Sequence, residues 1–160
     1  MIREFEQTDA DALWALLKPV FRAGDTYTIN PDISRADALA YWCGPGRRVF
    51  VLEEAGDVLG TYYLVRNQGG GGAHVCNCGF VTDPVARGRG LARAMLAHAL
   101  EAAQVAGFRA MQFNFVVATN TRAIATWERA GFDVVGRLPG AFHHPRHGYV
   151  DALVMYRSLV

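Results

Sequence analysis

Hydrophobic and polar positions divide the chain into segments with the periods of strands and helices. Apolar or alternating runs predict strands at residues 2–5, 49–53, 58–65, 74–81, 110–117, 133–137 and 149–156. Apolar positions three or four residues apart predict four helices, which begin after a cap at residues 8–11, at Ser34, at Leu91 and at Thr121. The order β-α-α-β-β-β-α-β-α-β-β is that of one α/β domain with a mixed sheet, spanning residues 1–160.

Glycine and proline mark the connections between these segments. The stretch 22–32 is predicted to be a loop, although it carries Tyr27, an aromatic residue that a mere linker does not need. The run Gly69–Gly72 is predicted to be a flexible connection. Between residues 137 and 149, proline, glycine and histidine predict an exposed polar loop that includes His143, His144 and His147, with a place at a substrate entrance as the alternative.

Composition and charge narrow the class of protein. A chain of 160 residues with 51% hydrophobic and 19% charged residues is typical of one globular domain. Sixteen basic and fifteen acidic residues give a net charge of +1, so we expect no nucleic-acid partner. No segment offers the ~18 consecutive apolar residues of a membrane helix, and the start of the chain does not look like a secretory signal. We therefore expect no membrane partner and a cytoplasmic location.

The stretch VTDPVARGRGLA, residues 81–92, carries the strongest chemical pattern and joins a predicted strand to a predicted helix. Gly88 and Gly90 let the main chain turn tightly and let a ligand approach without an intervening Cβ atom. Unpaired N–H groups at the helix start favour an anion. Three arginines can add charge-assisted hydrogen bonds: Arg87, Arg89 and Arg93. The pattern predicts a site for a pyrophosphate group.

Two common phosphate-binding motifs do not fit this stretch. A P-loop requires GxxxxGK[ST], which is absent. A dinucleotide fingerprint needs glycine or alanine where Arg93 stands, and an acidic residue about twenty positions later, where Gln112 stands. The remaining pattern, Arg/Gln-x-x-Gly-x-Gly/Ala, resembles the coenzyme A loop of the GCN5-related N-acetyltransferases, the GNAT family.

A second stretch supports this resemblance. Residues 120–132, NTRAIATWERAGF, are similar to the family's signature Asn-x-x-Ala-x-x-x-Tyr-x-x-x-Gly-Phe. The resemblance implies the GNAT fold, a mostly antiparallel sheet of about seven strands that is splayed between the fourth and fifth and flanked by about four helices. It also implies acetyl-CoA as cosubstrate and an amine as acceptor, and it allows a homodimer.

The resemblance also implies roles for individual residues. Backbone groups of Phe80, Val81 and Thr82 would face the pantetheine arm, and a backbone N–H near Val81 would stabilise the oxyanion. Asn120 would bond the pantetheine or thioester end. The pyrophosphate would be held by the loop and the helix start: Arg87, Gly88, Arg89, Gly90, Leu91, Ala92 and Arg93.

Two positions depart from the family's pattern. In much of the family a tyrosine protonates the departing thiolate, but here Trp127 stands at that position, and an indole N–H is not acidic. A frequent catalytic glutamate is replaced by Phe115. We therefore expect water held by Asn114 or Asn77 to take the amine proton, and a non-catalytic acyl-CoA sensor remains an alternative.

Asn77 and Asn114 interrupt otherwise apolar strands beside the expected splay. Such amides bond either to a neighbouring backbone or to a polar substrate such as a carboxylate or an amine. Together with Phe80, Asn120 and the Tyr27 loop, these asparagines form a set of residues similar to that of acetyltransferases that act on proline analogues such as azetidine-2-carboxylate. We expect Asn114 and Asn120 to be catalytic. We expect four residues to bind a small-molecule amine: Tyr27, Asn77, Phe80 and Asn114. A protein or peptide acceptor is the alternative, although the chain has no acidic cluster to bind one.

The cysteines do not predict a metal site. Cys76 and Cys78 form a C-x-C pair within a strand, and no second cysteine pair accompanies them. This spacing is poor for zinc, so we expect buried, reduced thiols and no metal.

Overall fold

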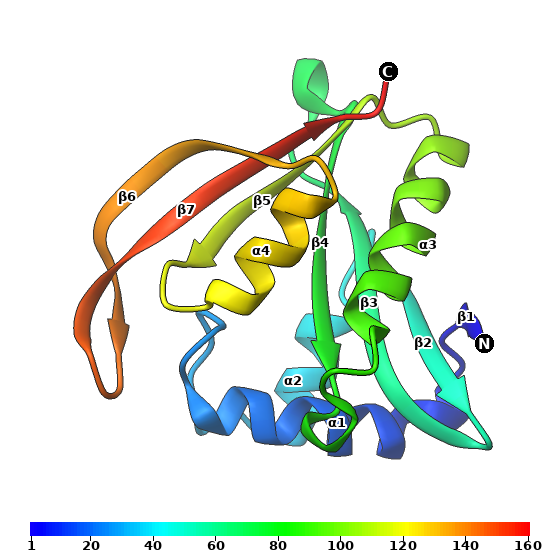
Figure 1. Ribbon diagram of the computed structural model, residues 1–160. Coiled ribbons are helices and arrows are strands. Elements are labelled where there is room, and N and C mark those ends of the chain that lie inside the picture. The colour runs from blue at the N-terminus through cyan, green and yellow to red at the C-terminus, as the bar shows by residue number, and fades with distance from the viewer.

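The computed structural model describes residues 1–160 and contains one seven-stranded sheet with four α-helices (Figure 1). The predicted order of elements and the predicted fold class are confirmed. The strands are β1 (Ile2–Glu4), β2 (Arg48–Glu54), β3 (Asp57–Arg66), β4 (Val75–Thr82), β5 (Ala110–Val117), β6 (Asp133–His144) and β7 (Gly148–Ser158). The helices are α1 (Ala10–Ala23), α2 (Arg35–Trp42), α3 (Leu91–Val105) and α4 (Thr121–Arg129).

The sheet has the strand order β1-β2-β3-β4-β5-β7-β6, and every pair is antiparallel except β4 with β5. These two parallel strands pair only at Val75 with Ala110 and at Cys76 with Met111. Beyond those positions they diverge, so the expected splay between the fourth and fifth strands is confirmed. From Asn77 to Thr82 the edge of β4 that faces β5 has no strand partner.

The helices cover opposite faces of the sheet and form two separate cores. On one face, α3 and α4 pack on apolar residues such as Met111 and Phe113. On the other face, α1 and α2 pack on residues such as Val49 and Tyr63. In this second core the Trp42 indole donates a hydrogen bond of 3.1 Å to the Thr61 hydroxyl, so its polar atom is satisfied although the residue is fully buried.

The β6–β7 hairpin differs from the sequence prediction. A strand at residues 133–137 followed by a loop was expected, but β6 continues to His144 and pairs with β7 as far as Gly148. Pro139 is tolerated because β6 is an edge strand, where a missing N–H removes no ladder bond. The register shifts between Leu138 and Phe142, and Gly140 takes a φ of +58° there, so the extra residues form a bulge.

Two further features complete the fold. The glycine run contains one short 3-10 turn, Gly70–Gly72. None of the helices combines the length and the apolar character needed to cross a membrane.

Candidate functional site

One large cavity of about 1530 Å³ passes through the gap between β4 and β5. Because it crosses the sheet, it has two halves. The glycine-loop half lies on the α3 and α4 side and is lined by most residues of the loop before α3, by residues on one face of α3, and by residues of α4 and its two ends between Asn120 and Ala130. The tyrosine half lies on the α1 and α2 side, and its wall includes Tyr27, Tyr41, Arg47, Tyr63, Asn77 and His144.

The loop before α3 has the conformation that its glycines allow. Gly88 and Gly90 have φ values of +79° and +76°, and a Cβ atom on either residue would meet nothing within 4 Å. Gly90 is the N-cap of α3 and supplies no side-chain cap, so the N–H groups of the first turn keep their capacity for a ligand. Arg87 and Arg93 line the same space and form no ion pair, so the loop is an open, positively charged cradle.

Arg89 is the one predicted pyrophosphate ligand that does not line the cavity. Its guanidinium pairs with the carboxylate of Glu54 at the β2–β3 turn. The other predicted loop and helix residues all lie in the cavity wall: Arg87, Gly88, Gly90, Leu91, Ala92 and Arg93.

The unpaired edge of β4 presents backbone groups to the gap. Val75 and Asp83 bond toward β3, since the Val75 carbonyl accepts from Asn67 and the Asp83 N–H donates to Leu59. In a regular strand the alternate residues point the other way, so Phe80 and Thr82 turn their N–H and C=O groups to the gap. The N–H of Val81, near which the oxyanion donor was expected, points to β3, which makes Phe80 and Thr82 the available donors.

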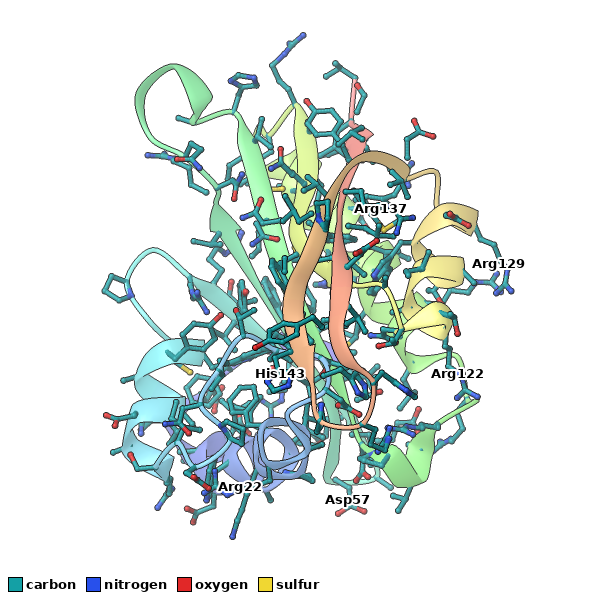
Figure 2. All side chains as sticks on the ribbon, turned by 90° about the vertical axis from the view of Figure 1, so that its left-hand side faces the viewer. Arg22, Asp57, Arg122, Arg129, Arg137 and His143 are labelled. Carbon is teal, nitrogen blue, oxygen red and sulfur yellow. The ribbon has the colours of Figure 1, made fainter.

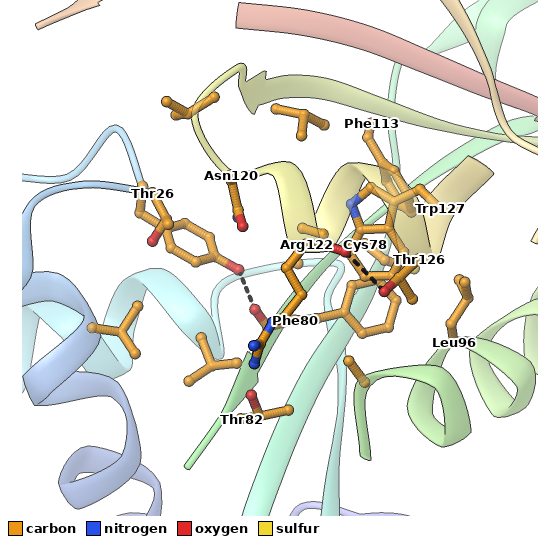
Figure 3. A pocket seen from close by; sticks show the side chains of 18 of the residues that line it. Thr26, Cys78, Phe80, Thr82, Leu96, Phe113, Asn120, Arg122, Thr126 and Trp127 are labelled. Carbon is orange, nitrogen blue, oxygen red and sulfur yellow. Dashed lines mark hydrogen bonds between the residues drawn. The ribbon is translucent and has the colours of Figure 1, made fainter. Parts of the chain in front are cut away.

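Asn120 and Trp127 face the cavity with polar groups that the protein leaves unused. Asn120 is the N-cap residue of α4, yet its side chain makes no capping bond. Figure 3 shows its amide directed into the pocket, across from Phe80. Trp127 is 8% exposed and packs on Phe80 and Phe113, with ring centroids 5.2 and 5.1 Å apart. Its indole N–H has no acceptor among the hydrogen bonds of the chain.

Arg122 was not singled out from the sequence, although it lies within the second signature. Figure 3 shows its side chain extending from α4 across the pocket toward the end of β4 at Thr82. It is exposed and forms no ion pair, so it adds a third free guanidinium to the glycine-loop half.

Tyr27 joins the two halves. Its hydroxyl donates a hydrogen bond of 2.8 Å to the Phe80 carbonyl, drawn as a dashed line in Figure 3. Desolvation of the hydroxyl raises the pKa of Tyr27 well above its ordinary value, so the phenol keeps its proton and remains a donor. Its ring packs edge-on against Phe21 and Trp42. Tyr27 therefore holds the loop after α1 against the open edge of β4.

Arg47 was also missed, because an arginine before a strand carries no distinguishing signal. Its guanidinium carbon lies 4.0 Å from the ring centroid of Tyr63 and 4.4 Å from that of Tyr41. Its Nη1 is buried without any hydrogen-bond partner. Both tyrosines and Arg47 line the cavity, as do Asn77 and Gly79 on β4. The ring of Tyr63 lies directly over Gly79, where a Cβ atom would come within 2.5 Å of it.

The two strand asparagines differ in their environment. Asn77 is half-buried in the cavity wall and its amide has no partner in the chain. Asn114 is exposed, donates a hydrogen bond of 2.6 Å to the Asn67 side chain and accepts one of 2.9 Å from Gln112. The amide of Asn114 is therefore already bonded at both of its atoms, by side chains rather than by the neighbouring backbone.

The expectation of an exposed loop holds for part of this segment: His143 and His147 are exposed and His147 lies in the turn between β6 and β7, but His143 and His144 belong to β6 and His144 is buried. His144 is 4% exposed and lies at the end of β6, where its Nδ1 accepts the Arg146 N–H at 3.1 Å. Desolvation lowers the pKa of His144, helped by His147 and Arg146 and opposed by Asp25. Figure 2 looks onto the hairpin, which runs down toward the loop after α1. His144, His147 and Asp25 all line the tyrosine half.

Two further side chains of the cavity, Asp25 and Cys78, bear on its chemistry. Asp25 forms no ion pair or hydrogen bond through its carboxylate, which provides a proton acceptor that was not found in the sequence. Cys78 also lines the cavity, but burial raises the pKa of its thiol well above the ordinary value. A neutral thiol is a poor nucleophile, which disfavours a covalent cysteine intermediate. The three cysteines are free thiols, and no three His, Cys, Asp or Glu side chains lie together as metal ligands would.

Comparison with known proteins gives consistent matches. The sequence profile of the acetyltransferase (GNAT) family matches residues 10–132. A GCN5-related N-acetyltransferase from Kribbella flavida is 40% identical, with a TM-score of 0.93 over 99% of this chain and 96% of that one. The N-acetyltransferase aca1 of Schizosaccharomyces pombe is 38% identical over 98 residues, which is 61% of this chain but only 47% of that protein, about half its length.

A more distant structure shows the same fold. A GNAT superfamily phosphinothricin acetyltransferase from Sinorhizobium meliloti, solved in complex with acetyl-CoA, has a TM-score of 0.85 at 21% identity. The match covers 99% of this chain and 87% of that one.

Proposed function

Because the chain belongs to the acetyltransferase (GNAT) family, we propose that it transfers the acetyl group of acetyl-CoA to the amine of a small molecule, with an amino or imino acid as the leading candidate. The observation that carries this proposal is the cavity through the sheet, which connects a phosphate cradle to a separate polar chamber. Such a cavity lets two substrates enter from opposite faces and meet at the gap between β4 and β5.

The glycine-loop half fits a coenzyme A molecule. The open cradle at Gly88 and Gly90, with the uncapped start of α3, suits a pyrophosphate. Arg87, Arg93 and Arg122 are free to pair with phosphate oxygens. The unpaired edge of β4 offers amide groups to the pantetheine arm in the manner of a neighbouring strand. Acetyl-CoA supplies the acetyl group as a thioester, which is activated for attack by nitrogen.

The residues at the gap have the groups that direct transfer needs. The amine nitrogen forms a bond to the thioester carbon, the carbon–sulfur bond breaks, and the thiolate leaves with the bonding pair. The N–H groups of Phe80 or Thr82 and the amide of Asn120 are the donors available to the negative charge on the carbonyl oxygen. The Trp127 N–H can donate a hydrogen bond to the thiolate. The acylated nitrogen releases its extra proton as the carbon–sulfur bond breaks, and the thiolate takes up that proton through water.

An amine is protonated at neutral pH, so a proton must first be removed. Asp25 is the unpaired carboxylate of the cavity and is our candidate acceptor, directly or through water held by Asn77. Asn114 is kept as a candidate that orients the same water, although its amide is bonded to Asn67 and Gln112. The neutral thiol of Cys78 favours direct attack over transfer through an acetyl-cysteine.

The test is thiol release from acetyl-CoA with a panel of amines. The panel contains azetidine-2-carboxylate, proline, other amino acids, polyamines, aminoglycosides and short peptides. We expect turnover with small amino or imino acids. Turnover with peptides alone would move the protein to the protein-modifying class. Tight acetyl-CoA binding without turnover on any amine would instead support a sensor.

A further inference from the structure

Arg47 is held in the tyrosine half by contacts that leave part of its guanidinium unused. The group lies between the rings of Tyr41 and Tyr63, at 4.4 and 4.0 Å from their centroids. These contacts engage the faces of the guanidinium, so its N–H donors still need acceptors in the plane of the group. The chain provides none for Nη1, which is the single buried polar side-chain atom of the protein without a hydrogen-bond partner.

Two other arginines, Arg3 and Arg48, have the carboxylate partners that Arg47 lacks. Arg3 bonds both Asp9 and Glu53, and the adjacent Arg48 pairs with Glu4 on the opposite face of β2. Arg47 forms no ion pair with any carboxylate of the chain. Leaving a buried donor unpaired costs about 1–3 kcal/mol, and more for a charged group. Nη1 has almost no accessible surface, so a ligand bonds it only after a small movement of the side chain, whereas the other guanidinium nitrogens keep accessible surface and also have no partner. A ligand that supplies these acceptors recovers this free energy on binding.

The surroundings favour a carboxylate as that ligand. A guanidinium presents a planar fork that matches a carboxylate, and the stacking on two tyrosines fixes the plane of the fork. Asn77 lines the same cavity, is paired across the sheet with Val65, two residues from Tyr63, and has an unpartnered amide that is available to a polar ligand. The phosphate cradle is in the other half of the cavity, so this chamber faces the acceptor rather than coenzyme A.

We propose that Arg47 binds the carboxylate of the acceptor substrate, which is therefore a free α-amino or imino acid. This inference rests on the proposed acetyl transfer. With the carboxylate at Arg47, the amine of such a small acid is directed toward the gap between β4 and β5, and Asp25 is the carboxylate left to take its proton. Polyamines and aminoglycosides lack the group that Arg47 needs.

The test compares an amino acid with its carboxamide in the wild type and in Arg47→Met. The amino acid used is the best amino-acid acceptor found in the panel. If no amino acid of the panel is turned over, proline is used. We expect the wild type to prefer the acid over the amide by about 100-fold in kcat/KM, the loss typical of removing one partner of a desolvated ion pair. Arg47→Met is expected to lose this preference, while its kcat/KM for the amide and its KM for acetyl-CoA stay within about twofold of the wild-type values. A dipeptide with the same first residue should behave like the amide, because its carboxylate lies farther from the amine.

Arg48→Met is the matched control, since Arg48 is the neighbouring arginine but points to the other face and is exposed. It is expected to change none of these ratios. Thermal unfolding of Arg47→Met should show no loss of stability, because the substitution removes an unsatisfied charge and keeps apolar contact with the rings. An equal loss for acid and amide, or a wild type without acid preference, would overturn the assignment.

A binding measurement separates this inference from the proposed function. Isothermal titration calorimetry with coenzyme A present gives the affinity for the amino acid and for the amide without any turnover. Acid-selective binding that is lost in Arg47→Met, without thiol release on any amine, supports Arg47 and contradicts the acetyl transfer. Turnover on polyamines with no selective binding of acids supports the transfer and contradicts the role of Arg47.

Discussion

The two halves of the cavity are built in different ways. The glycine-loop half comes from two short stretches at strand–helix junctions, and it offers mainly backbone N–H groups and arginines. The tyrosine half is assembled from α1 and the loop after it, from α2, from Arg47 just before β2, from β3 and β4, and from the β6–β7 hairpin. It offers side chains whose neighbours along the chain are unrelated to the site. Under the proposed function, the first half would bind the common cosubstrate through its backbone, while the second would select the acceptor through side chains that can change one at a time.

For the glycine-loop half, the largest expected effect tests whether ligand binding depends on backbone conformation. Gly90→Val places a β-branched residue at a φ of +76° in the cradle. We expect the KM for acetyl-CoA to rise about 30-fold, the equivalent of ~2 kcal/mol of strain in the conformation that binds. The KM for the amine should not change, which steady-state kinetics with each substrate varied in turn would measure.

Gly107→Val is the matched control for this prediction. Gly107 follows α3 at the far end from the cradle, has a φ of +84° and also has open space around its Cβ position. Both variants are expected to lose stability in thermal unfolding, but only Gly90→Val should affect acetyl-CoA. An equal KM in the two variants would mean that the loop does not bind the cosubstrate.

A smaller effect separates the two asparagines expected to be catalytic. Asn120 has a free amide in the cavity, so Asn120→Ala should lower kcat/KM at least about tenfold, or ~1.4 kcal/mol, whichever amine is used. Asn114 is bonded to Asn67 and Gln112, so Asn114→Ala should mainly raise the KM for the amine. Gln112→Ala removes one bond of this network and serves as the control. Unchanged values for both asparagine variants would remove them from the catalytic set.

The smallest effect concerns the response of the tyrosine half to pH. The pKa of His144 lies below its ordinary value, so the folded hairpin disfavours the protonated ring. The neutral His144 ring therefore contributes its full stabilisation of the folded hairpin above pH ~6.5. This contribution is lost as the pH falls toward the pKa of His144 in the folded protein. Acidification from pH 7.5 to 5.5 should raise the amine KM about threefold relative to His144→Asn, which keeps an acceptor for the Arg146 N–H. The KM for acetyl-CoA should show no such difference. If the amine KM depends on pH in the same way in the wild type and in His144→Asn, a role of the hairpin in binding the amine is contradicted.

The difference between the halves also explains what could be predicted from the sequence. The helices and most strands follow from local periodicity, while the splay was implied by the family resemblance that two contiguous motifs carry. The glycine loop was found because its residues are adjacent along the chain, and because Gly88 and Gly90 each have a backbone reason to be glycine. Arg47 and Asp25 were missed because only the fold brings them to the cavity, and neither has a local pattern of its own.

The hairpin shows a second kind of limit. Pro139 and Gly140 usually end a strand, and they led to the prediction of a loop there. Their tolerance depends on two tertiary facts: β6 is the edge of the sheet, and the Gly140 N–H is bonded by the Asp151 carboxylate on β7 at 2.9 Å. The same tertiary pairing buries His144, which no reading of the residues 137–149 alone could indicate.

The short pairing of β4 with β5 has a consequence for the behaviour of the protein without ligand. An open strand edge is usually found at the border of a sheet, where it invites pairing with another molecule and aggregation. Here the open edge from Asn77 to Thr82 lies in the middle of the sheet, where β5, α4 and the loop after α1 shield it from other chains. A slender molecule can enter where a second polypeptide strand cannot. The sheet thus lacks the hydrogen bonds of the open part of β4, and under the proposed function the pantetheine arm of coenzyme A would supply them.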